Sequence, residues 1–333
     1  MTTTKLDESA ELHQSAYAAM DSGALTDASV AFAALLRNEP ENASYHYMRG
    51  LAHKYLLDWP TSLHHNLRAI ELSEEVGEAE HWNAAIAATA LGEWSQTRRL
   101  WAACNVRVPE GAGPIEHDYG VAVVRLNPWG AGETLFARRI DPVRARLLNV
   151  PLPESGHRFG DIVLHDGAAT GYRFDGDGDG DGDGEGEGRK VAVFNELARL
   201  TVSEFQTFVV FVSCASPDDL QALLDATAPG LGYAEDWTQS VTYHCLRCSY
   251  GTPHRHDTPK VGDWQPDRNL GIAAQSRKSV EKLLKAWVAS SRNRSVDGIE
   301  TRECKLPERV DGHVWWCGPD EEDSDEGASS EQV

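Results

Sequence analysis

Apolar residues recur at helical spacing through the first third of the chain. Between residues 8 and 106, segments of helical length carry apolar positions on one face and alternate with short polar turns. Their pairing repeats about every 34 residues, which predicts a stack of three helix pairs. The expected helices cover residues 8–21, 26–38, 43–56, 60–73, 78–91 and 94–104.

The first pair places small and large residues at the positions of a known repeat. Gly23 lies at the turn, Ala28 is the small residue of the second helix, Phe32 and Leu35 are large, and Pro40 ends the unit. Matching positions in the next two units are Gly50, Asp58, Trp59, Ser62, Ala69 and Ile70, and then Gly92, Glu93, Trp94, Thr97, Trp101 and Cys104. This spacing resembles the tetratricopeptide repeat, whose members usually bind an extended peptide or a helix in a concave groove.

The resemblance implies a protein or peptide partner, and the second unit supplies the candidate contacts. Tyr45, Tyr47, His53 and Lys54 are the expected groove residues. The unit departs from the repeat pattern, because His46, Arg49 and His53 stand where apolar residues are usual. The alternative is that the three repeats only brace the domain that follows, since three units are the minimum for a stable array.

The pattern changes to short strands between residues 109 and 201. Glycine and proline become frequent and separate runs with β-type side chains, which predicts a small β-barrel-like domain. The expected strands cover residues 121–126, 135–139, 144–150, 161–165, 170–174 and 191–194.

An acidic insertion, residues 175–188, alternates an acid with glycine and holds no apolar residue. We expect it to be disordered and to lengthen one hairpin loop, because loop closure costs little for added length. A specific calcium loop of the EF-hand kind is disfavoured, since the acids stand only at odd positions and position twelve of a loop that begins at one of these Asp residues falls on Gly.

One polar cluster in this domain raises the possibility of catalysis. His157, Arg158, Asp161, His165 and Asp166 fall within ten positions, and a metal-dependent hydrolase could use His157, Asp161 and His165 as acid and base. The favoured interpretation is a turn followed by a strand, because no nucleophile or cofactor motif accompanies the cluster.

The last third predicts a βαββαβ order. Strands are expected at residues 208–214, 241–245, 270–274 and 299–304. Ser216 can cap the first helix, and Ser276 or Ser279 can cap the second. The order is typical of a ferredoxin-like sandwich, a fold that carries little information about function.

A dense group of metal-ligand residues lies between the halves of this domain. Cys245, Cys248, His254 and His256 offer two sulfurs and two nitrogens, the set that suits a structural tetrahedral Zn²⁺ site. Substitute ligands are His244, Asp257, Cys304 and Cys317. A redox CxxC or two ordinary reduced cysteines remain as alternatives.

Composition limits the remaining functions. Of the 21 net negative charges, 14 belong to the insertion and to the acidic tail, so the rest of the chain carries about −7. No basic cluster favours nucleic acid, no apolar run is long enough to cross a membrane, and the start lacks a secretory signal. We therefore expect a cytoplasmic, bacterial protein.

Four segments follow from these patterns: helical repeats over 1–106, a β-rich domain over 107–203, a ferredoxin-like domain over 204–318 and a disordered acidic tail over 319–333. They favour a binding or scaffold protein with a structural zinc site over an enzyme. The alternatives are the hydrolase and a bacterial immunity or regulatory protein that neutralises a basic partner.

Overall fold

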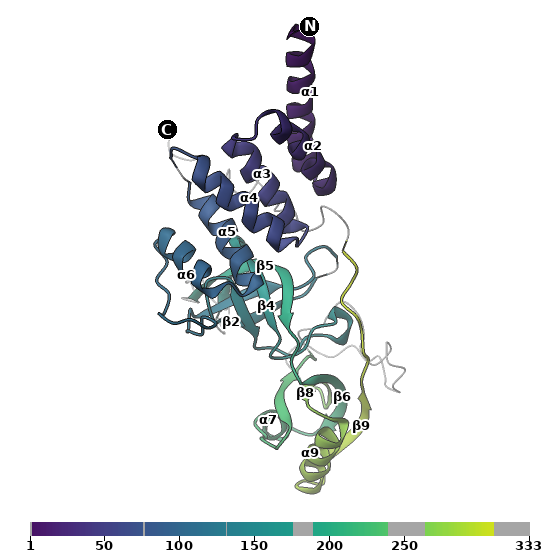
Figure 1. Ribbon diagram of the computed structural model, residues 1–333. Helices are drawn as coiled ribbons and strands as arrows, with labels where there is room; N and C mark the ends of the chain where they lie inside the picture. Colours follow the sequence, from purple (N-terminus) through teal and green to yellow (C-terminus); the bar gives the residue numbers. More distant parts are fainter. Residues whose placement is uncertain (1, 76, 131, 176–188, 239–263, 310–333) are drawn as a thin grey trace, which may run out of the picture.

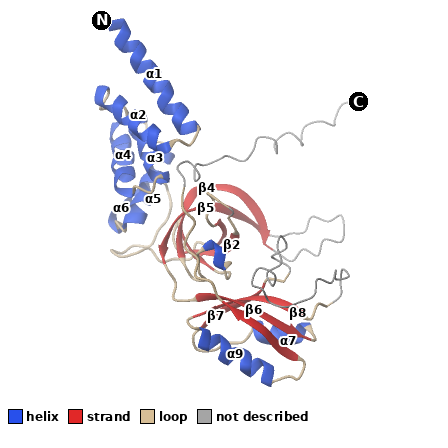
Figure 2. Cartoon of the chain, turned by 90° about the vertical axis from the view of Figure 1, so that its right-hand side faces the viewer, coloured by secondary structure: helices blue, strands red, loops and turns tan. Residues whose placement is uncertain are grey.

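The computed structural model describes residues 2–75, 77–130, 132–175, 189–238 and 264–309. Helices, a five-stranded barrel and a four-stranded sheet with its own helices follow one another along the molecule (Figure 1). The view turned by 90° shows the same order, with the barrel between the helices and the second sheet (Figure 2). No helix in these ranges has the length and apolar character needed to cross a membrane.

The N-terminal part is helical, as its periodicity predicts. Side-chain caps fix two of the starts: Asn42 accepts a hydrogen bond from the Tyr45 amide and Asp58 accepts one from the Thr61 amide. Gly92 ends a helix in the left-handed conformation, with φ of 72°. The helices are α1 (Thr2–Asp21), α2 (Leu25–Asn38), α3 (Ala43–Tyr55), α4 (Trp59–Leu72), α5 (Glu78–Leu91) and α6 (Trp94–Ala103).

Five strands form the barrel: β1 (Val121–Arg125), β2 (Thr134–Arg139), β3 (Arg144–Leu147), β4 (Ile162–Asp175) and β5 (Arg189–Thr201). Neighbours pair antiparallel in chain order, and β1 closes the ring through a short parallel pairing with β5. The runs expected at 161–165 and 170–174 belong to the one strand β4, whose register against β5 shifts around Gly167. Asp175 pairs with Arg189, so the acidic insertion connects two directly paired strands.

The second sheet has the order β7-β8-β6-β9, with every neighbour antiparallel. Its elements are β6 (Gln206–Cys214), α7 (Pro217–Leu224), β7 (Leu231–Asp236), β8 (Asp267–Ala274), α9 (Arg277–Ala289) and β9 (Arg294–Glu300). Ser216 and Ser276 cap the two helices, each accepting from the amide three residues on.

Of the expected strands of this sheet, one lies outside the described residues and another needs correction. The strand beside β8 is β7, whereas residues 241–245 lie outside the described part of the chain. The last strand ends at Glu300 and does not run over 299–304. A register shift there places Val296 and Ile299, three positions apart, against the same core, which hides the alternation that marks a strand.

One hydrophobic core joins the helices to the barrel. Ile86 and Trp101 from the helices pack in the same cluster as Val143, Leu164 and Leu197 from the barrel, and all five are almost completely buried. The helical part is therefore packed against the barrel on one side, and its position relative to β4 is fixed.

Candidate functional site

A cavity of about 490 Å³ lies where the helices meet the barrel. Its walls come from α3 and α5, each the first helix of a pair, and from the middle of β4. The lining residues are Tyr47, Leu51, Lys54, Tyr55, Glu78, Ala79, Trp82, Asn83, Ile86, Asp166, Gly167 and Ala168. The volume falls in the range of small-ligand and side-chain pockets.

A buried ion pair lies among the residues that line this cavity. The Lys54 Nζ is 3.0 Å from Asp166 Oδ1, and both side chains are almost completely buried. The Tyr55 hydroxyl donates to Asp166 Oδ2 at 2.6 Å, and the Gly167 amide donates to Oδ1 at 2.7 Å. Burial disfavours the Asp166 carboxylate, but the Lys54 ammonium and these hydrogen bonds hold its pKa below the ordinary value.

Burial also changes the tyrosines of the cavity. It raises the pKa of Tyr55 well above the ordinary value, and the neighbouring Asp166 carboxylate adds to the effect. Burial raises the pKa of Tyr47, with a further contribution from Glu80. Both hydroxyls are therefore neutral at pH 7 and act as hydrogen-bond donors and acceptors.

Glycine at position 167 allows β4 to approach α5. A Cβ at this position would lie 2.7 Å from Cε3 of Trp82, closer than packed atoms tolerate. The Trp82 ring is fixed in turn, because it meets Trp101 edge to face at 4.7 Å and its Nε1 donates to Glu78 at 2.8 Å. The aromatic wall of the cavity is thus rigid.

Two of the four expected groove residues lie at this cavity. Lys54 and Tyr47 line it. Tyr45 is buried instead, and its hydroxyl meets Nδ1 of His13 at 2.9 Å. His53 joins helices, with Nε2 at 2.7 Å from the Ser29 hydroxyl and Nδ1 at 3.1 Å from Asp58.

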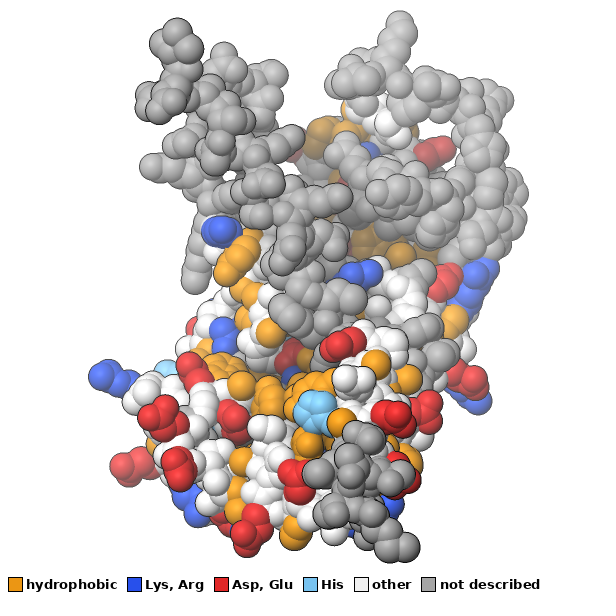
Figure 3. Space-filling view, turned by 90° about the horizontal axis from the view of Figure 1, so that it is seen from above, with side chains coloured by type: hydrophobic (Ala, Val, Ile, Leu, Met, Phe, Trp, Pro, Cys, Tyr) orange, Lys and Arg blue, Asp and Glu red, His pale blue; other side chains and the backbone are white. Residues whose placement is uncertain are grey.

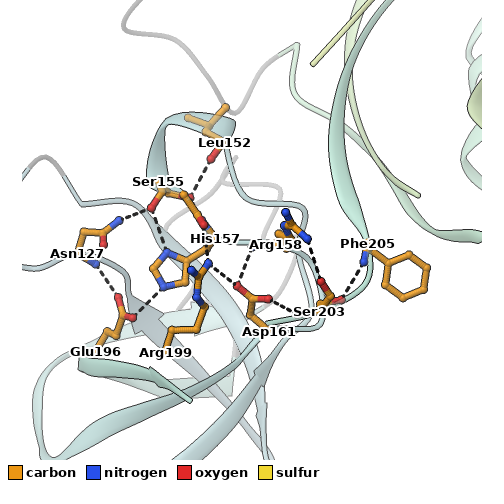
Figure 4. A network of polar contacts seen from close by, with 11 residues as sticks. Asn127, Leu152, Ser155, His157, Arg158, Asp161, Glu196, Arg199, Ser203 and Phe205 are labelled. Atoms are coloured by element: carbon orange, nitrogen blue, oxygen red, sulfur yellow. Dashed lines mark hydrogen bonds and ion pairs between the residues drawn. The ribbon is translucent and has the colours of Figure 1, made fainter. Parts of the chain in front are cut away.

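Figure 4 shows His157 and Asp161 of the cluster considered for a hydrolase within a network of polar contacts, where the two side chains have different partners. His157 Nε2 is 2.8 Å from Glu196 Oε1, and the other Glu196 oxygen accepts from the Asn127 amide. Asp161 accepts from the backbone amides of Ser203 and Arg158 at 2.7 and 3.0 Å. These bonds connect loops of the barrel. They agree with the interpretation of the cluster as a turn followed by a strand.

His165 takes no part in that network. Its Nδ1 is 2.8 Å from the Asp166 carbonyl oxygen, and its ring packs on Phe194 at 4.6 Å. Burial lowers the pKa of His165 to about 4, so the ring is neutral at pH 7. The geometry does not support a shared acid–base site of His157, Asp161 and His165.

The expected zinc ligands Cys245, Cys248, His254 and His256 lie outside the described residues. Within the described ranges, no group of three or more His, Cys, Asp or Glu side chains could hold a metal. Of the substitute ligands, Cys304 is described and is exposed.

Sequence reasoning identified Lys54 but missed its partner in the site. Lys54 and Asp166 are 112 positions apart, and no local pattern connects a helix end with a strand at that distance. One feature of the sequence could have indicated the pair: Lys54 stands at a position of its helix that faces the core. A buried lysine requires a counter-charge nearby.

Comparisons with known proteins add little to this geometry. No family model matches the sequence, and no match is found among curated proteins. Solved structures with some similarity include the complex of the TPR2B domain with pHsp70 from yeast Sti1. That similarity has 19% identity, covers 29% of this chain and 76% of the other, and has a TM-score of 0.27, which is too low to support an inference about fold or ligand.

Proposed function

We propose that this chain binds a protein or peptide partner and that the partner docks in the cavity between α3, α5 and β4. The observation that supports this is the open cavity itself, which combines rigid aromatic walls with a buried, hydrogen-bonded polar group. Binding sites commonly pair an apolar lining with a few fixed polar groups. The repeat spacing of residues 8–106 adds support, because such repeats usually bind an extended peptide or a helix in a concave groove.

The lining favours a partner with an apolar side chain next to a basic one. Leu51, Trp82 and Ile86 offer apolar contacts, whereas Glu78 is exposed at the cavity and carries a negative charge. Lys54 is already paired with Asp166. On the face seen from above, acidic side chains flank a hydrophobic strip, with some Lys and Arg side chains on the same face (Figure 3), and the chain as a whole has a net charge of −21. This charge suits a regulatory or immunity protein with a basic partner.

Bracing and binding are compatible in this arrangement. The helices share a core with the barrel, which fixes α5 against β4, and the same contact leaves the cavity between them. A preformed site of this kind costs little ordering entropy when a partner binds.

The experiment is to block the cavity without disturbing its base. Ala79 lines the cavity and is exposed, so Ala79→Trp places a large side chain in the site. Ala102→Trp makes the same change at an exposed position of α6 and serves as the control. Affinity purification from the native host with quantitative mass spectrometry should recover the partner with the wild type and A102W and lose it with A79W. Equal recovery with A79W would show that the cavity is not the docking site.

We further infer that the helices over 8–106 are tetratricopeptide repeats and that residues 204–318 hold a ferredoxin-like domain. Six helices in consecutive pairs support the first inference. The antiparallel order β7-β8-β6-β9 supports the second, since it places β8 between β6 and β7 as in a split βαβ arrangement. We also propose that the protein is located in the cytoplasm.

A structural zinc ion bound by Cys245, Cys248, His254 and His256 is the third part of the proposal. It rests on ligand type and spacing alone. Protein purified without a chelator or a histidine tag should contain one zinc ion per chain by elemental analysis, and Cys248→Ser should remove it. Metal-free wild-type protein would end this proposal and would leave the partner site untouched.

A further inference from the structure

A second cavity, of about 260 Å³, lies under the chain that follows β9. We call residues 301–309 the strap, because in Figure 1 this segment leaves β9 and runs back beside the barrel. The Trp129 indole donates to the Pro307 carbonyl at 3.3 Å, and Arg309 lies over the Trp129 ring at 3.9 Å. Gly156 faces the strap so closely that a Cβ there would lie 2.7 Å from the Leu306 nitrogen. The strap is therefore packed on the barrel and not loosely attached.

The charge of this cavity is opposite to that of the chain. Four cationic side chains line it, Arg158 and Arg199 from the barrel domain and Arg302 and Lys305 from the strap, against one acid, Glu303. The protein as a whole carries a net charge of −21. Cations gathered in one concave place repel one another unless anions compensate them.

The local carboxylates compensate these cations incompletely. Arg199 lies 3.4 Å from the buried Asp161, and Arg302 lies 3.3 Å from Glu154 in an exposed pair that contributes little. Within the described residues, neither Arg158 nor Lys305 has a carboxylate within 4.0 Å.

Backbone contacts hold the two barrel arginines in place. Arg199 donates to the Gly156 carbonyl at 2.6 Å, and Arg158 donates to the Ser203 carbonyl at 3.2 Å. Figure 4 shows the Arg199 guanidinium beside Asp161 and the Arg158 guanidinium beside Ser203. Each guanidinium has five N–H donors, so these contacts fix the side chains and leave further donors for a ligand.

Thr207 contributes a neutral side chain to the wall of the cavity. Thr207, at the start of β6, lines the cavity and is only 6% exposed. Its Oγ1 is buried and has no hydrogen-bond partner among the described residues. A buried polar atom without a partner costs free energy, and other side chains of the described residues share this state, so the cations and not this hydroxyl define the site.

We propose that this cavity binds an oxyanion with the size and charge of phosphate, either free or as a phosphate monoester. The donors come from three parts of the chain, namely the barrel, β6 and the strap, and a tetrahedral dianion can accept from several directions at once. Arginine suits such an ion because its guanidinium can donate two parallel hydrogen bonds. A bound anion would also link the strap to the barrel, so binding would stabilise the fold.

The test is calorimetric titration of the full-length protein with inorganic phosphate at constant ionic strength. We expect saturable binding with one site, and at ten times Kd a rise of Tm of about 2–4 °C. Lys305→Gln, at an exposed position, should weaken binding at least fivefold, and Arg158→Gln at least tenfold. Arg277→Gln, an exposed arginine of α9 paired with Glu281, is the matched control and should bind as the wild type does.

Further titrations identify the form of the anion and allow the proposal to fail. Glycerol phosphate binding at least as tightly as phosphate would identify a monoester, and binding of phosphate alone would identify the free ion. Acetate should bind at least tenfold more weakly, because it is planar and singly charged. The proposal would be overturned if binding did not saturate by 10 mM phosphate. This concentration is about ten times a Kd of 1 mM, which is a weak affinity for a specific site. Unchanged affinity in a folded Arg158→Gln, Lys305→Gln double variant would also overturn it.

Discussion

The Lys54 ammonium and the Asp166 carboxylate lie 3.0 Å apart although 112 positions separate them in the sequence. One residue belongs to α3 and the other to β4, so this buried pair joins the helical part to the barrel. Two charges leave water when the parts pack together, and their mutual attraction with the Tyr55 hydrogen bond offsets that cost. Because an unpaired buried charge is costly, the pair favours the packing of α3 against β4 over other arrangements of the two parts.

Removal of one charge should therefore destabilise the protein strongly. Lys54→Met leaves the Asp166 carboxylate buried without its counter-charge, and we expect the free energy of unfolding to fall by about 3–5 kcal/mol. Urea denaturation at pH 7, followed by the tryptophan fluorescence of the helices, measures the change.

The matched double variant separates charge from packing. Lys54→Met with Asp166→Leu removes both charges and should recover most of the lost stability, because apolar replacements of a buried pair are often neutral. Arg68→Met, which breaks the exposed pair with Glu71, should cost less than about 0.5 kcal/mol. A double variant as unstable as Lys54→Met would mean that shape and not charge fixes the contact.

Gly167 provides a second test of the contact between β4 and α5. Gly167→Ala places a Cβ 2.7 Å from the Trp82 ring, and that ring cannot move freely because Trp101 packs against it. We expect a loss of about 1–3 kcal/mol, as for other overpacked sites. Gly171→Ala in the same strand meets no atom within 4 Å, so thermal unfolding should leave its stability within about 0.5 kcal/mol of the wild type.

The helical part could be predicted closely because its signals are local. Apart from the start of α1, no expected helix end differs from the observed end by more than one residue. The helix expected at 43–56, for example, is α3 (Ala43–Tyr55). The cap at Asn42 and the left-handed Gly92 are local effects that the sequence shows directly. α1 differs most, since it starts at Thr2 rather than near residue 8.

The strands were harder to place because their positions depend on pairing. β4 reads as two runs, since Gly167 interrupts the apolar pattern, yet β5 pairs with it on both sides of that interruption. β7 (Leu231–Asp236) escaped notice because its burial is weak, and its pairing with β8 defines it. The site shares this difficulty: Lys54, Trp82 and Asp166 meet only through tertiary packing.

The buried His165 should make stability depend on pH. Its folded-state pKa of about 4 lies below the ordinary value of 6.5, so the unfolded chain binds a proton that the folded chain does not. Stability is complete above pH 6.5 and falls as the pH falls toward 4, by up to about 3 kcal/mol from this group.

His165→Asn should remove this contribution, since an amide can still donate to the Asp166 carbonyl and does not titrate. The difference in unfolding free energy between the wild type and this variant should change between pH 6.5 and 4, measured by urea denaturation at several pH values. His117→Asn, at an exposed position, is the control for a histidine outside the core. A difference for His165→Asn that does not change with pH would mean that water reaches the ring.

Glu133 should produce the opposite dependence on pH. Burial raises its pKa to about 7, from an ordinary 4.5, and the nearby Glu235 carboxylate adds to the rise, although the Leu152 amide donates to it at 3.1 Å. The folded chain therefore binds a proton between pH 4.5 and 7 that the unfolded chain does not. Stability from this group is present below pH 4.5 and decreases as the pH rises to about 7.

Glu133→Gln should stabilise the protein at pH 8 by up to about 3 kcal/mol. A neutral amide oxygen still accepts from the Leu152 amide and has no proton to lose, so the gain should shrink to almost nothing at pH 5. Urea denaturation at pH 5, 6, 7 and 8 gives the curve, and Glu116→Gln at an exposed position supplies the control. A gain that is the same at pH 5 and pH 8 would show that the Glu133 carboxylate is already ionised at pH 5 and that hydrogen bonding outweighs its burial.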